Sequence, residues 1–151
     1  MKIIIAAVGK MKKGPEAELL EAYKKRLPWD IVIKEIEEKR PLPAEKLKDS
    51  EASQLLSSLP ESSFKIALDE RGKQLGSRQL AEKLRGWLEG GAPVTFLIGG
   101  AAGHGRKIAE EANFTLSLGS LTWPHMLVRV MLMEQLYRSS TIISGHPYHK
   151  D

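Results

Sequence analysis

Short apolar runs alternate along the chain with longer segments in which apolar residues recur every three or four positions. The short runs are typical of buried strands, and the longer period is typical of amphipathic helices. Strands are predicted at residues 2–8, 30–36, 64–68 and 94–98. Residues 114–123 are predicted to contain a fifth strand and the loop that follows it. Helices are predicted at residues 14–26, 44–59, 77–89 and 124–138, the third of them capped by Ser77. This alternation predicts an α/β domain with a largely parallel sheet.

Two polar segments are expected at the same edge of that sheet. Asp69-Glu70-Arg71-Gly72 follows the run at 64–68, and a glycine-rich loop at 99–105 follows the run at 94–98. Ligands of open α/β sheets bind beyond the carboxyl ends of strands, so this edge is the expected binding site.

The helix predicted at 124–138 is apolar on almost every side. We therefore expect it to be buried nearly all round, partly against another subunit, which favours a homodimer. His125 and Arg129 share one face at i, i+4, and Glu134 and Arg138 form a second such pair. An internal ion pair or cap contact and a ligand-facing role both remain open for His125 and Arg129.

The glycine loop at 99–105 does not fit the two common nucleotide-binding patterns. A dinucleotide-binding loop would normally follow the first strand, where only Gly9 is present. In a P-loop alignment Arg106 and Lys107 replace the required Lys and Ser/Thr, which disfavours a nucleotide-dependent phosphotransferase. The loop can expose N–H groups to a ligand or can simply make a tight strand-to-helix turn.

Two further segments carry polar groups. Residues 119–124 form a backbone-rich loop that can present N–H and C=O groups to a heterocycle. The C-terminal tail contains His146, Tyr148, His149 and Lys150. Metal binding by the two tail histidines lacks carboxylate partners, so no metal is expected.

Composition limits the chemistry. The chain has 151 residues, the size of one domain, and it has no cysteine, which excludes disulfides, thiolate metal sites and cysteine nucleophiles. The apolar run at 2–8 is too short for a signal peptide or a membrane span, so a cytoplasmic protein is expected.

The charge balance permits an anionic partner such as RNA but does not require one. The 23 Lys and Arg residues exceed the 19 Asp and Glu residues, giving a net charge of +4. Cations gather in two clusters, one of Lys10, Lys12 and Lys13 and the other of Lys24, Lys25 and Arg26. Each cluster can contact phosphates or can be a solvated face, the second at a helix C-terminus.

Seven segments in the last third of the chain form a combined pattern. They are Leu97-Ile98-Gly99-Gly100, Leu116-Ser117-Leu118, Leu121-Thr122, Pro124-His125, Leu127-Val128-Arg129-Val130, Glu134-Gln135-Leu136-Tyr137-Arg138 and His146-Pro147-Tyr148-His149-Lys150. In this order they closely resemble the RlmH family of SPOUT-class methyltransferases of large-subunit ribosomal RNA. Ala7-Val8-Gly9-Lys10 and Leu68-Asp69 also match, so the likeness covers essentially the full length.

The resemblance implies a single SPOUT domain over residues 1–151, with a deep trefoil knot in the cofactor-binding part at about 94–151. It implies a homodimer that transfers a methyl group from S-adenosylmethionine to the position-3 ring nitrogen of a pseudouridine in 23S ribosomal RNA. No appended RNA-binding domain is visible, so we expect the substrate RNA to lie in an assembled ribosomal particle. The alternative is a non-catalytic RNA-binding or ribosome-associated module with the same fold.

The resemblance also implies site residues. The expected cofactor-binding residues are Leu68, Gly100, Gly119, Ser120, Leu121, Thr122, Trp123 and Pro124. The expected catalytic residues are His149, Tyr148, Arg129 and His125, of which His149 is the first candidate to accept a proton and His125 the second. Arg129 or Lys150 would favour the developing anion, Lys150 and Arg138 would contact the RNA, and the tail would reach the site of the partner subunit.

Overall fold

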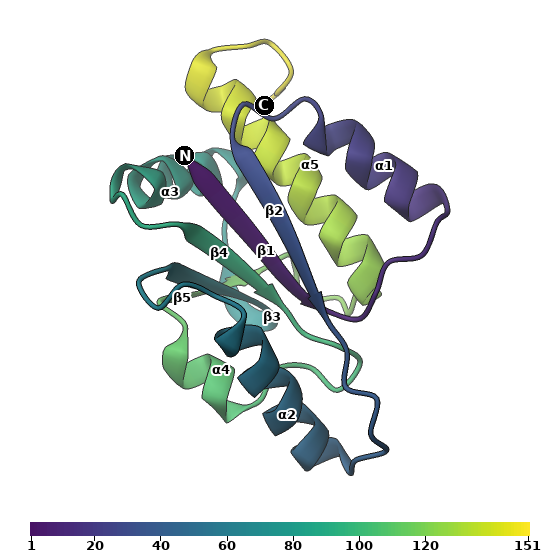
Figure 1. Cartoon of the computed structure of the whole chain (residues 1–151). Helices are drawn as coiled ribbons and strands as arrows, with labels where there is room; N and C mark the ends of the chain where they lie inside the picture. The colour runs from purple at the N-terminus through teal and green to yellow at the C-terminus, as the bar shows by residue number, and fades with distance from the viewer.

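Five parallel strands form one sheet in the order β2-β1-β4-β3-β5, as the computed structural model of residues 1–151 shows (Figure 1). The strands are β1 (Lys2–Val8), β2 (Asp30–Ile36), β3 (Phe64–Gln74), β4 (Val94–Ile98) and β5 (Phe114–Ser117). The helices are α1 (Pro15–Lys24), α2 (Ala44–Ser57), α3 (Ser77–Glu89), α4 (Arg106–Glu111) and α5 (His125–Ser144). The predicted α/β class with a parallel sheet is confirmed.

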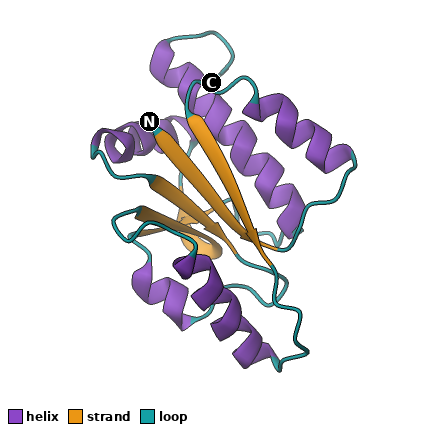
Figure 2. Ribbon diagram, viewed as in Figure 1, coloured by secondary structure: helices purple, strands orange, loops and turns teal.

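Helices cover both faces of the sheet, as Figure 2 shows. Successive side chains of a strand point to opposite faces. Ile3 and Ile5 of β1 belong to a core shared with α1, α3 and α5, whereas Ala6 and Val8 belong to a smaller core shared with α2 and α4. All residues of β4 are buried, because a central parallel strand is covered on both sides.

Strand β3 is six residues longer than the run at 64–68 that predicted it. Residues 69–72 do not leave the sheet at its edge but form a bulge inside the strand. Leu68 and Lys73 both pair with Leu116 of β5, so the intervening residues have no partner in the ladder. Gly72 closes the bulge, and a Cβ atom there would lie 2.7 Å from the carbonyl oxygen of Thr115, so only glycine allows this approach.

The predicted cap of α3 is wrong by one residue. Gly76 is the N-cap, and its N–H donates to the side-chain oxygen of Gln79 (2.8 Å). Ser77 is the first helical residue, and its hydroxyl donates to the side-chain oxygen of Gln135 on α5 (2.9 Å). The serine therefore ties two helices together.

Helix α5 continues six residues beyond the predicted end at Arg138. The hydroxyls of Ser140 and Thr141 donate to carbonyls three residues earlier, at 2.6 Å each, which allows these polar residues to remain helical. Leu127 and Ile143 remain 39% and 40% exposed in the single chain, so burial against a second subunit stays a prediction. No helix in the structure has the length and apolar character needed to span a membrane.

Candidate functional site

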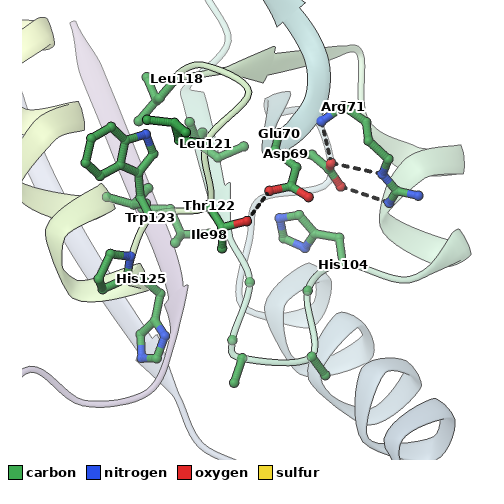
Figure 3. Close-up of a pocket in the computed structure, with 18 of the residues that line it drawn as sticks. Asp69, Glu70, Arg71, Ile98, His104, Leu118, Leu121, Thr122, Trp123 and His125 are labelled. Atoms are coloured by element: carbon green, nitrogen blue, oxygen red, sulfur yellow. Dashed lines mark hydrogen bonds and ion pairs between the residues drawn. The ribbon is translucent and has the colours of Figure 1, made fainter.

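A cavity of about 830 Å³ opens beside the bulge of β3 and the carboxyl ends of β4 and β5, where the sequence predicted a site (Figure 3). Apart from Lys48 of α2, the lining residues come from three segments that are far apart in sequence, within 68–71, 98–104 and 118–128. This volume is within the range of cavities that hold small molecules.

Seven of the eight expected cofactor-binding residues line the cavity. They are Leu68, Gly100, Gly119, Leu121, Thr122, Trp123 and Pro124. Ser120 belongs to the same loop but is not in the wall. The structure therefore brings the predicted segments together, while their contacts with a cofactor remain a prediction.

The glycine loop lies directly against β1 and α2. A Cβ atom at Gly100 would lie 2.9 Å from the Cγ1 atom of Val8 and 3.3 Å from the Oε2 atom of Glu51. A turn follows, in which the N–H of Gly103 donates to the carbonyl of Gly100 (2.9 Å) and Gly103 has a φ of 77°. The absence of side chains at these positions lets the backbone itself form the wall of the cavity.

His104 lines the cavity and was not among the predicted site residues. Its Nε2 atom lies 3.0 Å from the carbonyl oxygen of Leu97, which can only accept, so Nε2 carries the proton and Nδ1 is an acceptor. Burial lowers the pKa of His104, and the hydrogen bond to Leu97 and the charge of Asp69 oppose this effect. The sequence offered one signal, a single titratable residue within a run of glycines and alanines.

The bulge in β3 contacts the loop at residues 119–124, which forms part of the cavity wall (Figure 3). The Thr122 hydroxyl donates to Glu70 Oε2 (2.9 Å), and the Ser117 hydroxyl lies 3.1 Å from the Glu70 carbonyl oxygen. Asp69 accepts from the backbone and guanidinium of Arg71, and these hydrogen bonds lower the pKa of Asp69 despite its partial burial. Glu70 therefore holds the loop at 119–124, while Asp69 and Arg71 pair with each other within the bulge.

Arg129 and His125 do not face the same surroundings. His125 lines the cavity, whereas Arg129 is only 1% exposed and is not in the wall. Arg129 Nη1 forms an ion pair with Glu35 (2.6 Å), and Nη2 donates to the carbonyls of Val8 (2.9 Å) and Gly9 (2.6 Å). Of the two alternatives left open for Arg129, the structure has the internal ion pair.

The tail packs on α5 of its own chain and contributes nothing to the wall of this cavity. The Tyr148 hydroxyl donates to Glu134 (3.0 Å). The rings of Tyr148 and Tyr137 pack in a T-shaped arrangement, with their centroids 4.7 Å apart. Desolvation, together with hydrogen bonds to Tyr23 and Glu134, raises the pKa of Tyr148 to about 12.

His149 lies between two charged groups. Its Nδ1 atom is 3.1 Å from Arg138 Nη1, and its Nε2 atom is 3.1 Å from Asp151 Oδ1. A guanidinium only donates and a carboxylate only accepts, so the neutral ring in this arrangement carries its proton on Nε2. Arg138 is also paired with Glu134 at 2.6 Å, as the i, i+4 spacing predicted. Lys150 is exposed.

The arrangement suits binding of one ligand with apolar and polar parts. The cavity combines apolar side chains such as Leu68, Ile98 and Val128 with backbone groups of two loops and a neutral histidine. No group of three or more His, Asp or Glu side chains in the structure is arranged to hold a metal ion.

Sequence comparisons extend over the whole chain. The family model described as "Predicted SPOUT methyltransferase" matches residues 1–149. A protein of Paramagnetospirillum magneticum named "Ribosomal RNA large subunit methyltransferase H" is 52% identical over 151 residues, covering 99% of each chain. A protein of the same name from Rhodospirillum rubrum is 47% identical with the same coverage.

Comparisons with solved structures concern the fold alone, because sequence identity is low. A probable methylase family protein from Haemophilus influenzae matches with a TM-score of 0.60 and 12% identity, covering 99% of this chain and 70% of that chain. The SpoU methyltransferase AviRb from Streptomyces viridochromogenes, in complex with the cofactor AdoMet, matches with a TM-score of 0.51 and 11% identity. That match covers 92% of this chain and 58% of that chain.

Proposed function

Because the chain belongs to the SPOUT methyltransferase family, among the methyltransferases of large-subunit ribosomal RNA, we propose a specific reaction for it. The protein transfers a methyl group from S-adenosylmethionine to the N3 atom of a pseudouridine in 23S ribosomal RNA. The RNA is held in an assembled ribosomal particle in the cytoplasm.

The single observation that carries this proposal is the cavity at the carboxyl edge of the sheet. Residues 68–71, 98–104 and 118–128 meet there, and they include the segments that resemble the family's cofactor site. The AviRb structure, which shares the fold, contains AdoMet, and this supports the class of ligand.

The residues of the cavity fit such a ligand. Gly100 lies too close to Val8 and Glu51 to carry a Cβ atom, so only its backbone contributes to the wall, and the loop at 119–124 presents backbone donors and acceptors to a heterocycle. Leu68, Ile98 and Val128 supply apolar contacts. S-adenosylmethionine supplies an electrophilic methyl group on a sulfonium centre, so the protein must mainly orient the reacting atoms and exclude water.

The acceptor nitrogen must lose a proton, because an imide nitrogen is mostly protonated near neutral pH. We assign this proton to His149, whose Nδ1 atom must first leave Arg138 Nη1 in order to accept it, with His125 as the second candidate. Lys150 is exposed and free to stabilise the developing anion, whereas the guanidinium of Arg129 is already bound by Glu35 and two carbonyls. Arg138, whose Nη1 atom lies 3.1 Å from His149 Nδ1, positions His149 before the proton transfer, and we propose that it also contacts the RNA.

The tail requires a second subunit for this role. Tyr148 and His149 do not line the cavity of their own chain, so we propose that they complete the cavity of a partner in a homodimer. The proposal includes the deep trefoil knot at about 94–151, which would bring residues 98–104 and 118–128 together as one rigid cofactor site.

Two measurements test the reaction. Isothermal titration with S-adenosylmethionine separates an enzyme from a binding module that keeps the fold, since the module need not bind the cofactor. Mass spectrometry of ribosomal RNA from cells lacking the protein, with and without complementation, identifies the nucleotide. Methylation of assembled particles and poor methylation of protein-free 23S RNA are expected, and efficient methylation of free RNA would overturn the particle requirement.

A single-turnover experiment tests the proton acceptor. His149→Ala should abolish methyl transfer at saturating RNA and cofactor. His146→Ala is the matched control, because His146 is an exposed histidine of the same tail that accepts only the N–H of Tyr148 (3.2 Å). Methyl transfer that is intact in His149→Ala would show that His149 is not the base.

A further inference from the structure

The structure separates the two lysine-rich clusters that the sequence leaves equivalent. Lys24 is the last residue of α1, and Lys25 and Arg26 follow it and precede β2, which begins at Asp30 opposite Lys2. The second cluster therefore lies at the amino edge of the sheet, away from the cavity. Lys10, Lys12 and Lys13 follow the last residue of β1, so the first cluster lies at the carboxyl edge, where the cavity opens.

The second cluster is also largely occupied by contacts within the chain. Lys24 is paired with Glu21 at 3.7 Å. Arg26 donates to the Tyr137 hydroxyl (2.8 Å), and its guanidinium lies 4.2 Å from the centre of the Tyr137 ring. Arg26 thus joins the end of α1 to α5, whereas Lys24 is paired within α1.

The first cluster has no such partners. Lys10, Lys12 and Lys13 are all exposed, and none forms an ion pair or a side-chain hydrogen bond in the structure. Three uncompensated positive charges within four residues create a local surface that attracts anions.

This loop is held in place by a network around the buried side chain of Arg129. Glu35 Oε2 accepts from the N–H of Met11 (2.8 Å) and from Arg129 (2.6 Å), while Arg129 also donates to the Gly9 carbonyl (2.6 Å). The backbone that carries the lysines is therefore tied to β2 and to the first turns of α5. A positively charged loop with a fixed backbone loses little conformational entropy when a partner binds.

The same network places the loop beside the cavity. A Cβ atom at Gly9 would lie 3.6 Å from Met126 and 4.0 Å from Nε2 of His125, which lines the cavity. Figure 1 shows the dark purple segment after β1 passing the beginning of α5 on its way to α1. The lysines thus flank the wall of the cavity that α5 provides.

We propose that Lys10, Lys12 and Lys13 form a phosphate-binding surface that holds the backbone of the substrate RNA next to the cavity. The proposal rests on the function proposed above and names the part of the molecule that binds the RNA. Phosphate contacts position an RNA without reading its sequence, so such a surface can hold the RNA at the cavity while other contacts select the nucleotide.

The test compares two variants that each lose three positive charges. The first is K10Q/K12Q/K13Q, and the control is K2Q/K25Q/K83Q, whose three lysines lie on β1, after α1 and on α3 away from the cavity. Binding of large ribosomal particles is measured directly over a range of salt concentrations, together with the KM for particles and the affinity for S-adenosylmethionine.

The loop variant should bind particles about 10–100-fold more weakly near physiological salt, and its plot of log affinity against log salt should be shallower by about 2–3. Its affinity for S-adenosylmethionine should match that of the unmodified protein. Equal particle affinity and equal salt slope in the unmodified protein and the loop variant would overturn the proposal, as would an equal loss in the control.

The two proposals fail in different ways. If the unmodified protein binds particles but methylates none, the proposed reaction is wrong, and the binding data still decide the role of the loop. If the protein methylates particles and the loop variant does so with an unchanged KM, the reaction stands and the lysine surface does not.

Discussion

Replacing Arg129 by methionine should destabilise the protein by about 3–5 kcal/mol, because breaking a buried ion pair leaves its partners unpaired. Arg129 is 1% exposed, and its removal leaves Glu35 and the carbonyls of Val8 and Gly9 without their donor. Methionine fills much of the same space, so a cavity adds little. The Glu35 side chain is 30% exposed and can recover some hydration, which favours the lower end of the range.

Arg85→Met is the matched control. Arg85 on α3 also lies 2.6 Å from a carboxylate, that of Glu82, but the two side chains are 52% and 72% exposed. An ion pair so open to solvent contributes about 0–1 kcal/mol, so this variant should unfold almost like the unmodified protein. The two pairs share a distance but differ in burial and in the two carbonyls that Arg129 also binds, so the comparison measures these two differences together.

Urea unfolding at one fixed protein concentration measures both variants, since a dimer makes stability depend on concentration. Equal free energies of unfolding for Arg129→Met and Arg85→Met would refute the structural reasoning. If Arg129→Met unfolds like the unmodified protein but has lost methyl transfer, Arg129 acts in the chemistry instead.

Three further perturbations test the cavity and its supports. Gly100→Ala should weaken S-adenosylmethionine binding and lower stability by about 1–3 kcal/mol, because the new methyl group meets β1 and α2. Gly86→Ala, with nothing within 4 Å, should instead stabilise α3, by about 0.5–1 kcal/mol, and leave binding intact. Burial and the charge of nearby Glu38 raise the pKa of Glu51, so the native state holds this proton more tightly than the unfolded chain does. The proton bound to Glu51 stabilises the native state fully at low pH, and this stabilisation is lost as the pH rises. The stability of Glu51→Gln relative to the unmodified protein should therefore increase from about pH 4 to pH 8. Parallel pH profiles of unfolding for the two proteins would contradict this. Thr122→Val removes the exposed hydrogen bond to Glu70, so stability should change by less than about 1 kcal/mol while cofactor affinity falls in titration calorimetry; unchanged affinity would show that this bond does not hold the loop.

The strands could be predicted where local sequence decides them. The runs at 2–8 and 94–98 coincide with β1 and β4, because strands buried in a parallel sheet are apolar on both faces. The run at 30–36 coincides with the half-exposed edge strand β2, which its β-branched residues Ile31, Val32 and Ile33 predict. The end of β3 could not be predicted, since Lys73 and Gln74 return to the sheet only by pairing with β5 more than 40 residues later.

The end of α5 shows a second limit. The polar residues after Arg138 interrupt the apolar pattern, yet Ser140 and Thr141 satisfy their hydroxyls on the carbonyls of the preceding turn. Residues with hydroxyl side chains can therefore extend a helix beyond the residue at which the apolar pattern predicts its end.

The candidate site was predictable in its backbone segments and less so in its charged partners. The glycine loop and residues 119–124 carry recognisable patterns, and the structure places both in the cavity wall. The partner of Arg129 was not predictable, because Arg129 is on α5 and Glu35 lies 94 positions earlier, on β2. Local spacing identified a cation that needs a partner but could not identify which one it has.

The position of β1 also affects how the chain is made. Ile3 pairs with Val94, so one side of the first strand cannot be hydrogen-bonded until β4 has been synthesised. At about 5–20 residues per second a ribosome needs several seconds to add that stretch, during which an apolar strand edge stays exposed. Such distant pairing is typical of slow folding, so the nascent chain is expected to be most prone to aggregation before residue 98 emerges.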